Sequence, residues 1–279
     1  MRVLVTGAGG QLGRTIVRRF GGAHEVIALT RADLDVTRHA DVQRIVRTAR
    51  PEAVINCAAY NAVDGAEDDA SAALACNALA VRSLARVASD TGAALVHYST
   101  DFVFDGEARD PYDESAAPAP KSVYGQSKLL GEWFAADAPR YFVLRVASLF
   151  GGEPPHGSLD RIVLALREGR TARVFSDRFV SPGYVEDVAD ATGRLLAAAA
   201  APGVYHCVNS GCASWQEVGA EAARLLGVPA RLEPAAAADV TFRAPRPRFC
   251  ALSNAKLRAA GIVMPSWQDA LGRYLGARG

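Results

Sequence analysis

Short apolar runs alternate with amphipathic segments along the first 150 residues. The runs are rich in Val, Ile and Leu, which is typical of strands buried on both faces. Between them, apolar side chains recur at helical spacing, as at Ile16, Val17 and Phe20. The pattern predicts strands at 3–5, 26–29, 53–55, 93–98 and 141–144, with helices near 16–20, 41–49, 70–89 and 124–135. This order predicts an α/β fold with a doubly wound parallel sheet of the Rossmann type.

The pattern becomes less regular after residue 150. Glycines and prolines at 151–157 indicate a loop, 159–166 indicates a helix, and 203–207 a late strand. The alanine runs at 197–201 and 235–238 are expected to be helical filler. We therefore expect residues 1–150, completed by segments around 180–210, to bind a dinucleotide, and residues 151–279 to form a smaller, mainly substrate-binding region.

Composition narrows the class of protein. The 279 residues carry 31 Lys+Arg against 30 Asp+Glu, so nucleic acid is not expected as a partner. No apolar run approaches the roughly 18 residues of a membrane helix, and the first run is too short for a signal peptide. We expect a soluble cytoplasmic protein with no membrane partner. The 5 cysteines form no C-x-x-C pair, which argues against a disulfide framework or a zinc site.

A glycine-rich turn separates the first strand from the first helix, with the sequence Gly7-Ala8-Gly9-Gly10-Gln11-Leu12-Gly13. In a doubly wound fold this turn presents backbone N–H groups and a helix N-terminus to a pyrophosphate. A tight strand-to-helix turn also needs glycine for purely structural reasons. The context favours dinucleotide binding, and the predicted contacts are Gly7, Gly10, Gln11, Leu12 and Gly13.

The end of the second strand faces the adenosine ribose in such folds. Here Thr30 and Arg31 stand where an NAD-preferring site places an acid. Arg31 could bind the 2′-phosphate of NADPH, or it could be an ordinary surface arginine. Asp33 or Asp35 could instead reach the ribose hydroxyls, so NADH is the alternative cofactor.

Tyr124 and Lys128 lie four residues apart, on one face of a predicted helix. With 8 tyrosines and 3 lysines in 279 residues, about 0.09 pairs at this spacing are expected by chance. A nearby ammonium favours the phenolate, so it should lower the tyrosine pKa from about 10 toward the working pH. The pair therefore predicts a phenol that acts as a general acid.

Taken together, four segments resemble the extended short-chain dehydrogenase/reductases, and among them the dTDP-4-dehydrorhamnose reductases. The similarity extends over nearly the whole chain, including the tail from Arg246-Pro247 to Trp267. It implies reduction of the C4 ketone of a nucleotide-linked 6-deoxyhexose by NAD(P)H. The segments are the glycine turn, residues 56–60, residues 97–106 and residues 124–132.

The resemblance also implies roles for individual residues. Thr100 would polarise the ketone, Tyr124 would protonate the oxyanion, and Lys128 would tune Tyr124 and hold the nicotinamide ribose. Further cofactor contacts are implied at Ala58, Ala59 and Tyr60, beside Arg31 and Asp35, and substrate contacts at Thr100, Asp101, Phe102 and Ser148.

Three positions distinguish this chain within the superfamily. Phe102 follows Asp101 where related dehydratases carry a Glu as base, so reduction is the simpler interpretation. Ser148 replaces a Trp that many rhamnose-forming members carry, so the identity of the sugar stays open. Thr15 replaces a Glu that some members use in a magnesium-bridged dimer, so no metal site is expected, while a homodimer stays open.

Two other functions remain compatible with these motifs. A 4-epimerase would keep its NAD bound and return the hydride to the same substrate. A non-catalytic regulatory subunit, such as the beta type of methionine adenosyltransferase, shares the fold and the Tyr/Lys motif and acts by binding a partner. The sequence also leaves open the nucleotide base and the pathway.

Overall fold

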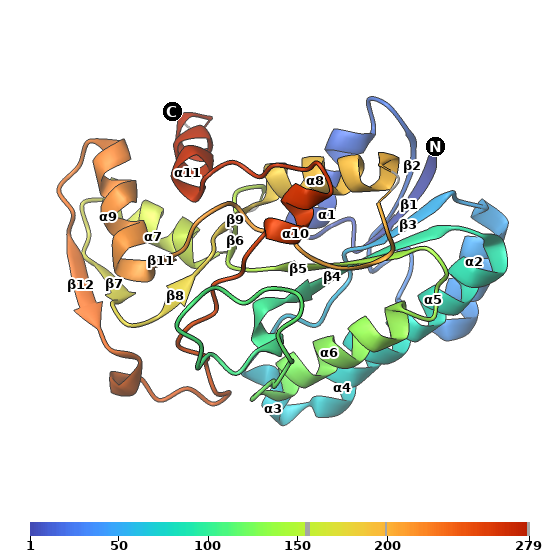
Figure 1. The fold of residues 1–279 in the computed structure, drawn as a ribbon, viewed down its shortest axis with the longest axis horizontal. Helices are drawn as coiled ribbons and strands as arrows, with labels where there is room; N and C mark the ends of the chain where they lie inside the picture. Colours follow the sequence, from blue (N-terminus) through green and yellow to red (C-terminus); the bar gives the residue numbers. More distant parts are fainter. Residues whose placement is uncertain (154–156, 199, 278–279) are drawn as a thin grey trace.

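Six parallel strands form one sheet in the order β10-β5-β4-β3-β1-β2 (Figure 1). The computed structural model describes residues 1–153, 157–198 and 200–277. The sheet confirms the doubly wound fold, with the five strands expected before residue 150 and the late strand beside them. They are β1 (Arg2–Thr6), β2 (Glu25–Leu29), β3 (Ala53–Asn56), β4 (Ala94–Thr100), β5 (Tyr141–Val146) and β10 (Gly203–His206).

The strand order reverses at β1. This strand pairs with β2 on one side and with β3 on the other, so Val3 lies between Val26 and Ala53. The crevice beyond the carboxyl ends of the strands at such a reversal is where doubly wound folds bind ligands. Residues 7–13 leave β1 at this point.

Helices cover both faces of the sheet (Figure 1). Successive strand residues point to opposite faces, so Val5 packs toward α1 and α8, whereas Leu4 packs toward α2 and α5. Burial on both faces explains the continuous apolar runs. One face carries α1 (Gln11–Phe20), α8 (Val185–Ala197) and α10 (Ala255–Ala259), and the other α2 (His39–Ala49), α5 (Ala80–Thr91) and α6 (Val123–Ala135).

The helix expected at 70–89 is not uniform. It consists of α4 (Ala70–Leu74), a π-helical turn η1 (Ala75–Leu79) and α5, preceded by the short α3 (Gly65–Asp68). The side chain of Asn77 is fully buried in this turn. Its Oδ1 accepts the Tyr60 N–H at 2.8 Å, and its Nδ2 donates to the Tyr60 carbonyl at 3.1 Å and to Ser127 Oγ at 3.0 Å. Wider turns of this kind often occur at functional sites.

A second core lies beside the sheet, at the left of Figure 1. Apolar faces of three helices meet there over paired short strands. The helices are α7 (Ser158–Arg167), α9 (Trp215–Leu226) and α11 (Trp267–Gly276). The strand pairs are β7 (Ala172–Phe175) with β12 (Leu232–Ala235), β8 (Phe179–Val180) with β11 (Ala213–Ser214), and β6 (Leu149–Phe150) with β9 (Gly183–Tyr184).

The alanine run at 235–238 was wrongly predicted as helical. Ala235 ends β12, and Ala237–Asp239 form a single 3-10 turn, η3. Acidic side chains close this turn, because Asp239 accepts the N–H of Ala236 at 3.1 Å and Asp177 that of Ala237 at 2.8 Å. This run is too short to offset the unfavourable free energy of helix nucleation.

Two other predictions are only partly testable. Helix α8 ends at Ala197, where the first alanine run begins, but residue 199 lies outside the described residues. Residues 154–156 of the expected loop at 151–157 also lie outside them. None of the helices in the described part of the chain has both the length and the apolar character needed to span a membrane.

A buried ion pair joins α6 to the sheet. The Arg145 guanidinium on β5 donates from Nε to Glu132 Oε1 at 2.9 Å and from its terminal nitrogen to Oε2 at 2.7 Å. Ser99 of β4 donates to the same Oε1 at 2.5 Å, and the Phe104 ring lies 4.9 Å from the guanidinium carbon. The Arg145 and Glu132 side chains are 4% and 3% exposed.

We predict that Glu132→Ala lowers the free energy of unfolding by about 3 to 5 kcal/mol, because it leaves a buried guanidinium unpaired. Urea unfolding of the purified variant measures the loss. Glu25→Ala is the matched control, since the Arg2–Glu25 pair is 43% and 61% exposed and should contribute less than about 1 kcal/mol. Equal losses in the two variants would contradict the prediction.

Candidate functional site

The glycine turn after β1 is packed tightly against its neighbours. Gly7 has φ +64°, and a Cβ there would lie 2.5 Å from the Ala58 nitrogen. Gly10 is the N-cap of α1 and offers no side chain to cap the helix. The first N–H groups of α1 are therefore free of a side-chain cap and face the cleft, which suits a phosphate group.

A cleft of about 740 Å³ begins at this turn and continues past the end of β4 to the second core. It brings together most of the residues predicted from the sequence, which were expected to serve two different ligands. Those lining it are Gly10, Gln11, Leu12, Gly13, Ala59, Thr100, Asp101, Phe102, Tyr124, Lys128 and Ser148.

Five predicted residues do not line this cleft in the described structure: Gly7, Arg31, Asp35, Ala58 and Tyr60. Gly7 and Ala58 approach each other in the wall behind it. Tyr60 is held by Asn77 through its backbone and packs in a small apolar cluster with Tyr124. These three residues therefore shape the cleft.

Thr100 and Tyr124 are positioned by the ends of two elements. Thr100 is the last residue of β4, and Asp101–Val103 continue as a 3-10 turn, η2. Ser122 caps α6 by accepting the Gly125 N–H at 3.1 Å, which fixes Tyr124 in the first helical turn. A Cβ on Gly125 would collide with the Phe102 carbonyl, so glycine is needed for this close approach.

The pKa of Tyr124 departs from the sequence-based prediction. Burial, with a smaller contribution from the nearby Asp101, raises the pKa of Tyr124 to about 12, although a hydrogen bond with Thr100 acts in the opposite direction. The predicted lowering by Lys128 is therefore wrong for this structure, because the Lys128 ammonium donates to the Tyr98 carbonyl at 2.5 Å. Tyr124 is protonated at neutral pH, which is the form that a proton donor needs.

Lys128 is also strongly affected by its surroundings. The side chain is 2% exposed. Burial lowers its pKa to about 8, although Cys76 and Glu132 favour the charged form. The ammonium still predominates at neutral pH.

At the end of β2, the acidic side chains are engaged within their own loop. Asp33 accepts the backbone N–H and the hydroxyl of Thr30 at 2.9 and 2.6 Å. Asp35 does the same for Thr37 at 3.0 and 2.7 Å. Arg31 is exposed and makes no ion pair with any described residue. Of the three candidates, Arg31 is thus the charged group left for a ligand.

Sequence reasoning missed four further residues that line the cleft: Arg161, Arg178, Trp215 and Arg246. Arg178 lies over the rings of Phe175 and Phe242, at 5.2 and 5.7 Å. These residues are far apart in sequence and meet only in the folded chain. The only sequence signal was the cluster of arginines and prolines around Arg246.

Ser148 lines the cleft, and its substrate role stays a prediction. Its φ is +45°, and among the described residues Arg50 is the other non-glycine residue with positive φ. Strained backbone of this kind concentrates at functional sites. The small side chain leaves room at this point of the wall.

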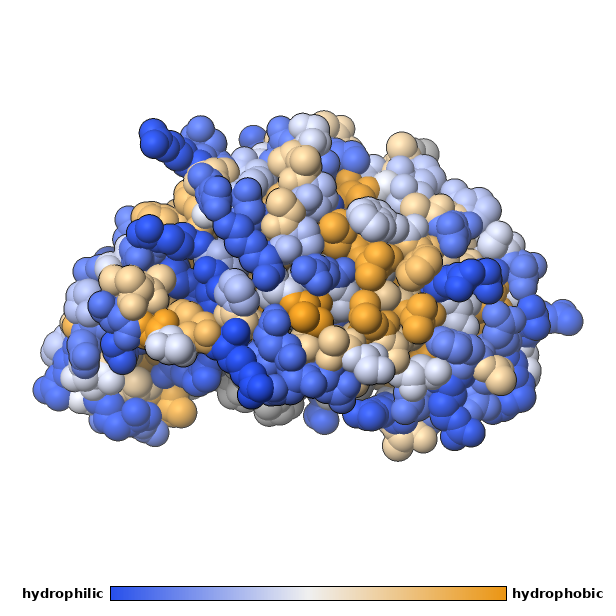
Figure 2. All heavy atoms as spheres, turned by 90° about the horizontal axis from the view of Figure 1, so that it is seen from below, coloured by the Kyte–Doolittle hydropathy of each residue, from blue (hydrophilic) through white to orange (hydrophobic). Residues whose placement is uncertain are grey.

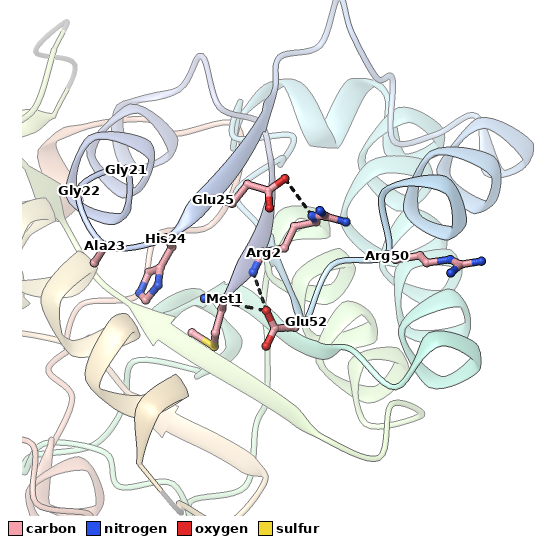
Figure 3. Close-up of a pocket in the computed structure, with 9 residues that line it drawn as sticks. All are labelled: Met1, Arg2, Gly21, Gly22, Ala23, His24, Glu25, Arg50 and Glu52. Carbon is pink, nitrogen blue, oxygen red and sulfur yellow. Dashed lines mark hydrogen bonds and ion pairs between the residues drawn. The ribbon is translucent and has the colours of Figure 1, made fainter.

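A second hollow lies at the opposite edge of the sheet, at the amino ends of β1 and β2 (Figure 3). Most of its charged groups already pair with one another. Arg2 binds Glu25 at 2.9 Å, and Glu52 accepts the Arg2 backbone N–H at 2.7 Å (Figure 3). It contains none of the predicted functional residues, so the cleft at the carboxyl ends is the candidate site.

Comparison with known proteins supports the family resemblance. Residues 1–278 match the family model described as RmlD substrate binding domain. The chain belongs to this family. It is 39% identical, over 97% of its length and 93% of the relative's, to a probable dTDP-4,6-dihydroxy-2-methyloxan-3-one 4-ketoreductase of Streptomyces antibioticus. It is 38% identical to a dTDP-4-dehydrorhamnose reductase of Streptomyces griseus, over 97% and 91% of the two chains.

A solved structure agrees with these relatives. The dTDP-4-dehydrorhamnose reductase of Bacillus anthracis, crystallised with NADP, superposes with a TM-score of 0.94 at 32% identity over 99% of both chains. The extended short-chain dehydrogenase/reductase fold expected from the motifs is confirmed.

Proposed function

We propose that this protein reduces the C4 ketone of a dTDP-linked 4-keto-6-deoxy-L-hexose, with NADPH as the hydride donor. The observation that carries the proposal is the convergence of Thr100, Tyr124 and Lys128 in one cleft with the glycine turn. Its family relatives are dTDP-sugar ketoreductases by name, which supports the same reaction class.

The proposed chemistry assigns one role to each side chain. When bound, NADPH supplies the hydride for C4. Tyr124 gives its phenolic proton to the developing alkoxide oxygen, and Thr100 donates a hydrogen bond to the same oxygen. Lys128, held by the Tyr98 carbonyl, would place its ammonium beside the nicotinamide ribose of the cofactor.

The glycine turn fits a dinucleotide. The start of α1 carries no capping side chain, and Gly10 has no Cβ to fill the space before it. We assign Gly10, Gln11, Leu12 and Gly13 to the pyrophosphate, with Ala59 along the same wall. Arg31 is assigned to the 2′-phosphate, because Asp33 and Asp35 are turned into their own loop.

The part of the cleft wall formed by Arg161, Arg178 and Trp215 suits the nucleotide of the substrate. Arg161 makes no ion pair among the described residues, and Arg178 faces aromatic rings, so both guanidinium groups suit a diphosphate. Trp215 offers an aromatic surface for the base. Asp101, Phe102 and Ser148 would line the sugar. We assign residues 1–150, completed by segments around 180–210, to the cofactor-binding domain, which also contributes these three residues to the sugar site, and residues 151–279 to a region that mainly binds the substrate.

We also propose a cytoplasmic homodimer, with neither nucleic acid nor membrane as partner. Leu79 and Trp133 are 43% and 62% exposed on η1 and α6, two elements that pack together. Figure 2 shows apolar side chains gathered on this half of the molecule. A second copy of the chain would cover this apolar surface. Sedimentation of the wild type and of Trp133→Lys tests this dimer. Equal sedimentation masses for the two proteins would contradict a dimer through this face.

The decisive assay follows NADPH oxidation with freshly generated dTDP-4-keto-6-deoxy-L-hexose, and NMR assigns the product. dTDP-4-keto-6-deoxy-D-glucose serves as the comparison substrate. Tightly bound NAD with no net oxidation would instead indicate a 4-epimerase. Capture of a partner enzyme without any turnover would indicate a regulatory subunit.

We predict that Tyr124→Phe lowers kcat by about 10² to 10⁴ while the affinity for NADPH stays nearly unchanged. The ring keeps its contact with Phe102, with centroids 5.8 Å apart, and only the proton donor is removed. Steady-state kinetics and cofactor titration measure the two effects. A variant that retains more than a tenth of wild-type kcat would disprove the assignment.

We predict that Arg31→Ala reduces the preference for NADPH over NADH by about ten- to a hundredfold. A charge-assisted hydrogen bond to a phosphate contributes about 1.5 to 3 kcal/mol, whereas NADH offers a neutral hydroxyl. The ratio of kcat/KM for the two cofactors measures the change. Arg14→Ala is the control. Arg14 is also an exposed arginine near the glycine turn: it lies on α1, and its Nε donates to the Gly9 carbonyl. An unchanged ratio in Arg31→Ala would make Arg31 an ordinary surface charge.

A further inference from the structure

The hydroxyl of Thr100 has two partners within its own turn. Its Oγ1 lies 2.9 Å from Asp101 Oδ1 and 3.2 Å from the Phe102 nitrogen. The Phe102 N–H donates only, so it occupies one of the two acceptor positions on the hydroxyl oxygen. Asp101 itself is 4% exposed and lines the same cleft.

The charge on Asp101 decides what Thr100 offers to a ligand. An ionised carboxylate accepts only, so it takes the single hydroxyl hydrogen of Thr100 and leaves none for the ketone. A protonated carboxyl can donate to the remaining acceptor position on Oγ1. The hydroxyl hydrogen of Thr100 is then free to point into the cleft.

Several titratable or charged groups face this carboxyl. They are the Tyr124 phenol of α6, the Arg178 guanidinium before β8 and the Cys250 thiol of the C-terminal segment. Burial outweighs the hydrogen bonds from Thr100 and Cys250 and the charge of Arg178, and raises the pKa of Asp101 to about 6. Burial also raises the pKa of Cys250, so the thiol stays neutral. Both charge states of Asp101 are therefore accessible near neutrality.

We propose that Asp101 is a positioning residue that sets the direction of the Thr100 hydroxyl: protonated, it makes Thr100 a hydrogen-bond donor to the substrate ketone; ionised, it withdraws that donor. The inference rests on the proposed reduction and deepens it. Asp101 keeps its proton throughout the step. The O–H bond of Tyr124 breaks, the new O–H bond forms on the substrate, and the hydride of the nicotinamide cofactor reaches C4.

The sign of the pH effect follows directly. The protonated fraction of Asp101 falls as the pH rises through about 6, so kcat of the wild type should decrease by about tenfold across this step, the effect of one lost hydrogen bond. In Asp101→Asn the amide nitrogen donates to Thr100 at every pH, while its oxygen faces the donors Arg178 and Cys250. The variant should show a flat profile from about pH 5 to about pH 8 and exceed the wild type at the upper end.

The experiment compares kcat against pH for wild type, Asp101→Asn, Thr100→Val and the double variant. If Asp101 acts through Thr100, the decrease in kcat with rising pH disappears in Thr100→Val. Adding Asp101→Asn to that variant then changes the pH profile no further. Persistence of the step in either single variant, or loss of turnover at every pH in a folded Asp101→Asn, would overturn the proposal. If Asp101→Asn fails to fold, the profile of Thr100→Val alone still decides.

Infrared spectroscopy of the carboxyl band gives a readout that needs no turnover. The band that disappears in Asp101→Asn reports the protonation of Asp101. If that variant fails to fold, Asp101 is assigned instead to the band that shifts between wild type and Thr100→Val. Because the Thr100 hydroxyl stabilises the ionised form, Thr100→Val should raise the pKa of this group. An unchanged titration would overturn the proposal, whereas absent NADPH oxidation with the expected titration would contradict only the proposed function.

Discussion

The buried pair between Glu132 and Arg145 fixes the register of α6 on the sheet, and the geometry of the site depends on that register. Placing two charges out of water costs several kcal/mol for each ion, and only a complete set of hydrogen bonds offsets it. Ser99 completes the set, and it immediately precedes Thr100. A shift of α6 by one residue would break these bonds, so Lys128, one turn before Glu132, is held at a fixed distance from the end of β4.

A second restraint acts on the opposite side of α6. Asn77 in the π-helical turn binds Ser127, which lies between Tyr124 and Lys128, and it also binds both backbone groups of Tyr60. One side chain thus connects α6 to the loop after β3. The irregular turn has a physical reason, because a regular helix at 70–89 would direct position 77 differently. The site is therefore held between a buried charge pair and a buried amide.

Local signals in the sequence predicted the parts of the molecule that depend on neighbours in the chain. The strands, the glycine turn and the placement of Tyr124 and Lys128 on one helix all come from short segments whose local structure depends little on tertiary context. The cluster of Arg161, Arg178 and Arg246 could not be predicted in this way, because three separate segments of the second half bring it together. The sequence pointed to the wrong direction for the Tyr124 pKa because spacing reveals a nearby ammonium but not the depth of burial.

That burial has one consequence shared by the reacting groups. It raises the pKa of Tyr124 to about 12 and that of Asp101 to about 6, and lowers that of Lys128 to about 8. Each shift favours the neutral form of its group, which shows that these side chains lie in a region of low dielectric. The same cleft also holds guanidinium groups: Arg178 and Arg246 share the ring of Phe242, and Arg178 lies close enough to Asp101 to affect its pKa. A ligand with a diphosphate and an uncharged ketone suits this combination, because arginines can bind the phosphates while the carbonyl enters the low-dielectric surroundings of Tyr124, where a single hydrogen bond to a developing oxyanion has its largest effect.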